Sequence, residues 1–116
     1  MINREIIDVN LINYKSGLNY FSNNADLYEK YIFKFLDDTH FNDAKKAFEN
    51  NDNEQLLEFV HALKGITGTL AMTKLFEACC EVVNAIRAKE ISKIPELFHT
   101  LEEVYSTTYN YVKSLS

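Results

Sequence analysis

Glycine and proline are scarce in this sequence, which has three glycines and one proline among 116 residues. Sheet proteins rich in turns need more of both, so the scarcity favours long helices. Long apolar runs are also missing, because none approaches the ~20 residues that span a bilayer. The first residues contain neither the basic segment nor the apolar segment of a signal peptide. We therefore expect a helical protein of the cytoplasm with no membrane segment.

Positive charge is in short supply as well, with 12 lysines and arginines against 17 acidic residues and a net charge of −5. Nucleic-acid binding needs a basic face, so we expect no nucleic-acid partner. The two cysteines, Cys79 and Cys80, are adjacent. A helix would point them about 100° apart, one toward the core and the other to its flank. The three histidines lack the spacing of metal ligands, so no metal site is expected.

No linker, repeat or low-complexity tract divides the chain, and its length is that of one domain. We predict a single domain over residues 1–116, with a lead-in at 1–22 and a helical bundle at 23–115. The lead-in is expected to form one or two short helices around its apolar residues, which are Ile6, Leu11, Leu18 and Phe21.

Apolar residues at helical spacing predict five further helices, over residues 25–38, 41–49, 54–70, 73–89 and 92–115. Asn23-Asn24 offers a cap for the first of them. Thr73 and Ser92 can cap the last two, and Pro95 lies in a first turn, where its missing N–H costs little. The first helix has a wide apolar face, which comprises Leu27, Tyr31 and Phe35 with Tyr28, Ile32 and Leu36 beside them.

The connections between these helices are short, and short connections between amphipathic helices specify antiparallel neighbours. The expected fold class is therefore all-α: an antiparallel up-and-down four-helix bundle with one or two extra short N-terminal helices. The core stripe of the helix over 54–70 comprises Leu56, Val60, Leu63, Thr67 and Leu70.

The most informative segment lies in the middle of that helix, where His61 stands next to the core stripe. Gly65 and Gly68 follow four and seven residues later on the same helix face. Each glycine costs roughly 1 kcal/mol relative to alanine, so both together predict that something approaches His61 across bare backbone. A neutral imidazole is a competent nucleophile, and Lys64, one turn along, could offset the charge of a phosphoryl group. A partly buried structural histidine and an ordinary solvated lysine are the alternative interpretations.

The segment His61-Ala62-Leu63-Lys64-Gly65 resembles the His-x-x-Lys-Gly segment of histidine-containing phosphotransfer (HPt) domains, which lies in the middle of a bundle helix. The resemblance spans roughly residues 17–113. Two positions depart from the family pattern. Ala71 stands where members often have glycine, and Val83 stands where many carry a glutamate or glutamine that orients the imidazole. The remaining matches are the small-residue stretch 67–70, Leu75, Cys79 and, upstream, 17–21, 26–28 and Phe35.

The resemblance implies a phosphorelay intermediate of two-component signalling, not an enzyme with its own turnover. His61 would accept a phosphoryl group from the aspartyl phosphate of a receiver domain and pass it to another receiver, while Lys64 balances charge. Ala62, Gly65 and Gly68 would contact the partner. The implied partners are receiver domains of response regulators or of a hybrid sensor histidine kinase. The chain would be a monomer with no cofactor of its own, and Mg²⁺ would be supplied by the receiver.

Two other functions remain open at this stage. The same bundle could be an adaptor that binds a receiver or another partner without phosphotransfer, and Val83 is the main support for that interpretation. The second is the dimerisation and phosphoacceptor segment of a sensor kinase. Such segments usually have an acidic residue directly after the histidine and a proline downstream, whereas Ala62 follows His61 here.

Overall fold

A computed structural model describes residue 2 and residues 7–116 of the chain. This part of the chain is helical and contains no strand, so the all-α expectation is confirmed. None of its helices is long and apolar enough to cross a membrane. Ile6, which marked a lead-in helix, lies outside the described residues. The elements are α1 (Tyr14–Tyr20), α2 (Ala25–Lys34), η2 (Phe35–Asp37), α3 (His40–Glu49), α4 (Asn53–Thr69), α5 (Thr73–Arg87), η3 (Ile91–Lys93) and α6 (Ile94–Leu115).

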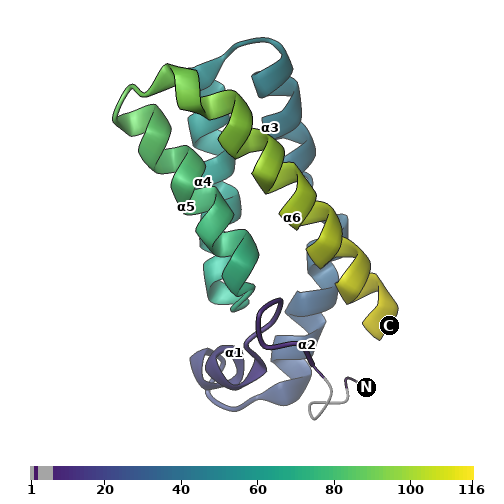
Figure 1. Ribbon diagram of the computed structural model, residues 1–116. Helices are drawn as coiled ribbons and strands as arrows, with labels where there is room; N and C mark the ends of the chain where they lie inside the picture. The colour runs from purple at the N-terminus through teal and green to yellow at the C-terminus, as the bar shows by residue number, and fades with distance from the viewer. Residues whose placement is uncertain (1, 3–6) are drawn as a thin grey trace.

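The bundle consists of α4, α5 and α6 as antiparallel neighbours, with α2 and α3 sharing the fourth position (Figure 1). In Figure 1, α3 packs against the upper part of α4, and α2 lies below it, near the free end of α6. A single helix was expected over 25–38, but the α-helix ends at Lys34 and continues as a 3₁₀ turn to Asp37. Asp38 is extended, with φ −70° and ψ 137°, so the chain changes direction there.

The start of each helix is well defined where a side chain caps it. The Asn24 side chain accepts a hydrogen bond from the N–H of Leu27 at 3.1 Å, as expected. The predicted caps Thr73 and Ser92 are wrong. The capping position of α5 is Met72 and that of α6 is Lys93, and neither side chain forms a capping bond. Met72 is fully buried, so the chain enters α5 from the core and Thr73 is already helical.

The core stripe of α4 is buried as expected, at Leu56, Val60, Leu63, Thr67 and Leu70. On α2 the expected face is only partly correct. Tyr28, Ile32 and Phe35 are buried, but Leu27 and Tyr31 are 38% and 42% exposed. The reason is the position of α2: it packs mainly against α1 and α6, and Tyr31 lines an open groove between α2 and α4.

The N-terminal helix α1 is held to both α2 and the end of α4. At Gly17 the backbone approaches the Tyr28 ring so closely that an added Cβ would lie 2.0 Å from its hydroxyl oxygen. The Tyr28 hydroxyl donates to the carbonyl of Leu70 at 2.7 Å. Burial, and to a lesser extent Tyr14, raises the pKa of Tyr28 above its ordinary value, which keeps this donor protonated. Glu29, which is buried, accepts a hydrogen bond from the Tyr14 hydroxyl at 2.5 Å.

The connection between α4 and α5 contains a strained residue. Ala71 has φ 58°, a left-handed conformation. For residues with a Cβ this conformation costs roughly 1–2 kcal/mol, and glycine adopts it freely. Glycine, which the resemblance leads us to expect at this position, would adopt this conformation without strain.

Replacing Ala71 with glycine should therefore raise the free energy of unfolding by about 1 kcal/mol, since relief of strain exceeds the added flexibility of the unfolded chain. Urea denaturation would measure the change. Ala88→Gly is the matched control: Ala88 follows α5 at φ −81°, so glycine gains nothing there and should lower stability. A destabilised Ala71→Gly protein would contradict the assignment of strain to this residue.

Candidate functional site

His61 lies in the middle of α4, and its side chain is exposed. The two flanking stripe residues, Val60 and Leu63, are fully buried. Because successive residues of a helix are rotated by about 100°, burial of these two turns His61 outward. Its imidazole makes no hydrogen bond or ion pair with any residue that the structure describes. No described residue therefore occupies either ring nitrogen, and the exposed ring can present a nitrogen lone pair to a partner.

A hollow of about 280 Å³ lies in front of the imidazole. Its floor is the backbone of α4 at Gly65 and Gly68, and the two glycines leave room for different neighbours. A Cβ added to Gly65 would meet no atom within 4 Å, so this backbone is open to a visitor. A Cβ added to Gly68 would lie 3.0 Å from the Phe76 ring of α5, so Gly68 makes room for packing inside the chain. The hollow is lined by Tyr20, His61, Lys64, Gly65, Gly68, Thr69 and Phe76.

Lys64 lines the same hollow one helical turn from His61, and its side chain is half-buried. It forms no ion pair with a carboxylate in the described part of the chain. An ammonium without an internal partner can offset the charge of an anion bound beside His61. Ala62 does not line this hollow. It lies on the adjoining surface of α4, which forms a larger groove.

The far side of α4 is closed and offers the imidazole no partner. Val83 of α5 is fully buried among core residues, and neither Glu81 nor Asn84 hydrogen-bonds to His61. Cys79 is buried and Cys80 half-buried, both as free thiols, as the sequence predicted. Burial raises the pKa of the Cys79 thiol to about 12, so this thiol remains neutral at ordinary pH. The site therefore presents its chemistry on one face of α4.

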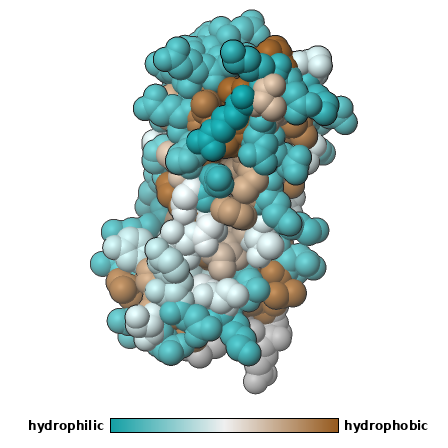
Figure 2. Space-filling view, turned by 90° about the vertical axis from the view of Figure 1, so that its left-hand side faces the viewer, coloured by the Kyte–Doolittle hydropathy of each residue, from teal (hydrophilic) through white to brown (hydrophobic). Residues whose placement is uncertain are grey.

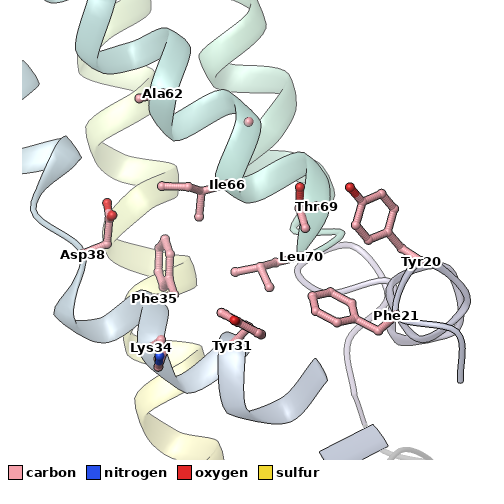
Figure 3. Close-up of a pocket in the computed structure, with 11 residues that line it drawn as sticks. Tyr20, Phe21, Tyr31, Lys34, Phe35, Asp38, Ala62, Ile66, Thr69 and Leu70 are labelled. Carbon is pink, nitrogen blue, oxygen red and sulfur yellow. The ribbon is translucent and has the colours of Figure 1, made fainter. Parts of the chain in front are cut away.

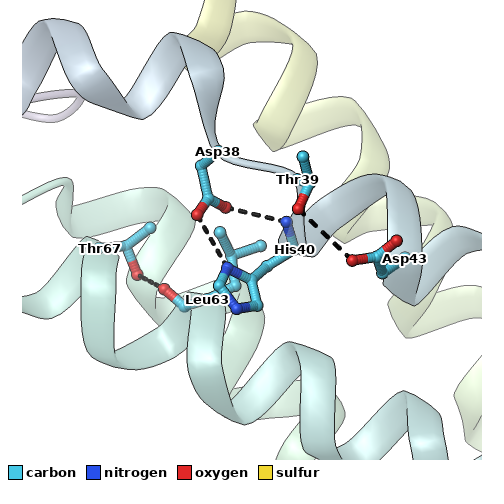
Figure 4. A network of polar contacts seen from close by, with 6 residues as sticks. All are labelled: Asp38, Thr39, His40, Asp43, Leu63 and Thr67. Atoms are coloured by element: carbon cyan, nitrogen blue, oxygen red, sulfur yellow. Dashed lines mark hydrogen bonds and ion pairs between the residues drawn. The ribbon is translucent and has the colours of Figure 1, made fainter.

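A second histidine has the carboxylate partner that His61 lacks. His40 Nδ1 lies 2.8 Å from Asp38 Oδ1, and the backbone N–H of His40 donates to Asp38 Oδ2 at 3.0 Å (Figure 4). Asp38 lies in the break between η2 and α3, His40 is the first residue of α3, and both are half-buried. His40 lines neither the hollow nor the groove beside it. We interpret this pair as a contact that fixes the change of chain direction at Asp38. The sequence alone did not suggest it.

The groove beside the hollow has a volume of about 740 Å³ and lies between α1, α2 and α4 (Figure 3). Tyr20, Gly65 and Thr69 line both the groove and the hollow, so the two form one continuous depression. Figure 2, which views the left-hand side of Figure 1, shows pale and light-brown residues gathered at mid-height below a more hydrophilic region. Nothing in the sequence marked Tyr20 as part of this groove, and Tyr31 was expected on a buried apolar face. Nothing in helical periodicity signals that a predicted apolar face lacks a covering helix.

Comparison with known proteins gives one family. The family model of the Hpt domain matches residues 33–110, which include His61, Lys64 and both glycines of the hollow. The match begins at the end of α2, so α1 and most of α2 precede it. No curated protein and no solved structure matches the chain significantly.

The two glycines of the floor should respond differently to alanine. Gly65→Ala should raise the free energy of unfolding by roughly 0.5–1 kcal/mol, because the helix gains propensity and nothing obstructs the methyl group. Gly68→Ala should give no such gain, since the Phe76 ring must move to admit the methyl group. Urea denaturation of both variants tests this. Equal stabilisation of the two would show that Phe76 does not require a glycine at position 68.

Proposed function

This chain belongs to the Hpt domain family, and we propose that it relays a phosphoryl group through His61, from the aspartyl phosphate of one receiver domain to the aspartate of another. Hpt domains are phosphotransfer modules, not kinases, and they work with receiver domains and kinases in phosphorelays. The observation that supports the assignment to His61 is its placement: an exposed, unpaired imidazole in mid-helix, in front of an open hollow.

The transfer needs a nucleophile, an in-line approach and compensation of charge. The His61 Nε2 lone pair attacks phosphorus, so an N–P bond forms while the P–O bond to the donor aspartate breaks. The bonding electrons leave with that carboxylate, and the proton on Nδ1 of the phosphorylated ring can pass to water. Charge spreads over the three remaining phosphoryl oxygens in the transition state, and the Lys64 ammonium lies on the same face to offset part of it.

We propose that Mg²⁺ enters the reaction with the receiver domain, where it neutralises phosphoryl charge. In residue 2 and residues 7–116, no group of three or more histidine, cysteine, aspartate or glutamate side chains could hold a metal ion. This chain contributes the imidazole, one cation and an unobstructed floor at Gly65. We propose that the protein acts as a monomer in the cytoplasm.

Val83 favours a second candidate function. Because this residue is a buried valine, no side chain from that position orients the imidazole, and the arriving receiver would have to do so. A bundle that binds a receiver or another partner but no longer passes phosphate, an adaptor, would have no need of an oriented ring. The third interpretation, a sensor-kinase dimerisation segment, has no support from the family match.

The phosphoacceptor is tested by replacing His61 with glutamine. We expect wild-type protein, incubated with a receiver loaded from radiolabelled acetyl phosphate, to acquire a label that is labile in acid and stable in base. His61→Gln should reduce this label to background and leave helicity unchanged, because the side chain is exposed. His99→Gln is the control and should keep the label, because His99 is an exposed histidine of α6 that lines neither the hollow nor the groove. Absence of label on wild type would favour the adaptor, and label on His61→Gln would assign the acceptor elsewhere.

Lys64 is tested in the same assay. Lys64→Ala should slow labelling about tenfold, which is below the effect of a buried oxyanion donor because Lys64 is partly open to solvent. The exposed Lys113, near the far end of α6, provides the control variant Lys113→Ala, which should label at the wild-type rate. Equal rates for both variants would remove Lys64 from the mechanism.

A further inference from the structure

Three aromatic residues form one edge of the groove beside His61, and we call them the aromatic lip: Tyr20, Phe21 and Tyr31. Tyr20 ends α1 and is 69% exposed, and Tyr31 of α2 is 42% exposed. Phe21 lies between them, with ring centroids 5.7 Å from each. Figure 3 shows the lip on one side of the groove, with Ile66 and Thr69 of α4 and the following Leu70 on the other. An exposed cluster of this kind marks a surface for a partner.

The lip is held in place from below. Phe21 stacks on the buried Tyr28 ring at a centroid distance of 5.2 Å, and Tyr28 in turn hydrogen-bonds to the Leu70 carbonyl of α4. Gly17 lets α1 approach that same ring closely. Tyrosine side chains on such a support offer a large contact area at a small cost in conformational entropy. The lip is therefore organised for contact before any partner arrives.

A receiver on His61 would extend over the lip. Stable protein–protein interfaces bury roughly 800 Å² on each partner, which is far more than the small hollow offers. Tyr20, Gly65 and Thr69 border both depressions, so a partner that covers the Gly65 backbone also meets the groove. Lys34 and Asp38 are the charged residues among those lining the groove, and the rest of its lining is apolar or uncharged. The fitting surface on the receiver is thus largely apolar.

The lip also differs in origin from the reacting residues. His61, Lys64 and Gly65 all lie within the family match at residues 33–110, whereas Tyr20, Phe21 and Tyr31 all precede it. The reacting residues thus lie inside the segment that the family model matches, and the lip lies outside it, on residues whose sequence at 17–21 also resembles the family. Because the lip lies at the end of α1 and on α2 and the reacting residues lie on α4, a change in the lip can alter partner choice without altering the reacting groups.

We propose that the aromatic lip selects the receiver domain, with Tyr20 as the main specificity-determining contact. The proposal rests on the phosphoacceptor role of His61. The preferred receiver packs an apolar surface against Tyr20 and Tyr31 while its aspartyl phosphate meets His61. Receivers without that surface reach His61 but dock weakly, so the lip acts on KM more than on the rate of the bound complex.

The test compares two phosphodonors. Phosphoramidate is a small donor that needs no docking: its P–N bond breaks, ammonia leaves, and the new N–P bond forms on His61. The protein donors are the purified receiver domains of the source organism, each loaded with acetyl phosphate. For every receiver, the labelling rate at low concentration is divided by the rate with phosphoramidate, so that changes in the imidazole itself cancel.

In Tyr20→Ala we expect this ratio to fall about tenfold for the best receiver, as for a truncated interface anchor, and by less than about twofold for the poorest. Tyr20→Phe keeps the ring and should retain the wild-type ranking. Ile91→Ala, which truncates an exposed apolar residue of η3 at the other end of the bundle, is the control and should change no ratio.

An unchanged ratio for the best receiver in Tyr20→Ala would overturn the proposal. An equal fall for all receivers would overturn it as well, since the lip would then contribute affinity without selection. Wild-type protein that is labelled neither by phosphoramidate nor by any receiver would instead refute the acceptor role of His61. The two failures are distinguishable because phosphoramidate labels the acceptor histidine without docking, and the label that His61→Gln retains is subtracted as the contribution of His40 and His99.

Discussion

The rotational register of α4 is the constraint on which the rest of the site depends. A helix advances about 100° per residue, and α4 packs Val60, Leu63 and Thr67 into the core on one side. With that side fixed, His61 has to point outward, and Gly65 has to lie on the surface one turn further along. The Thr67 hydroxyl fits this buried side because it donates to the Leu63 carbonyl of its own helix at 2.9 Å. Exposure of the imidazole is thus a consequence of core packing.

The break at Asp38 is what makes the surface around His61 uneven. Had α2 continued as one straight helix into α3, it could have packed along the whole of α4 and covered Gly65. The chain instead changes direction at Asp38, where the contacts of Asp38 and His40 hold the break (Figure 4). Below the break, α2 packs mainly against α1 and α6 and leaves the C-terminal half of α4 uncovered on one side. The same change of direction therefore lets α3 pack against one half of α4 and leaves a groove beside the other half.

The features that the sequence predicted correctly are those that depend on local periodicity and local hydrogen bonds. The register of α4 and the cap at Asn24 are of this kind. The caps at Thr73 and Ser92 failed because the residue before each helix is fixed by tertiary packing or by a preceding 3₁₀ turn. The predicted burial of Leu27 and Tyr31 is wrong because an apolar helix face does not indicate whether another helix packs against it. Tyr20 and the neighbour of Gly68 could not be found from spacing, since each depends on a contact between elements distant along the chain.

The exposed backbone at Gly65 has a consequence for the order in which receiver domains bind in the proposed relay. His61 is accessible from one binding surface, because the opposite side of α4 packs into the core. A donor domain and an acceptor domain would bind this same surface, so they could not bind at the same time. Each must leave before the other arrives, so an excess of idle, unphosphorylated acceptor would slow the loading step by blocking entry. The flow of signal would then depend on the relative abundance of the competing domains as well as on their intrinsic affinity.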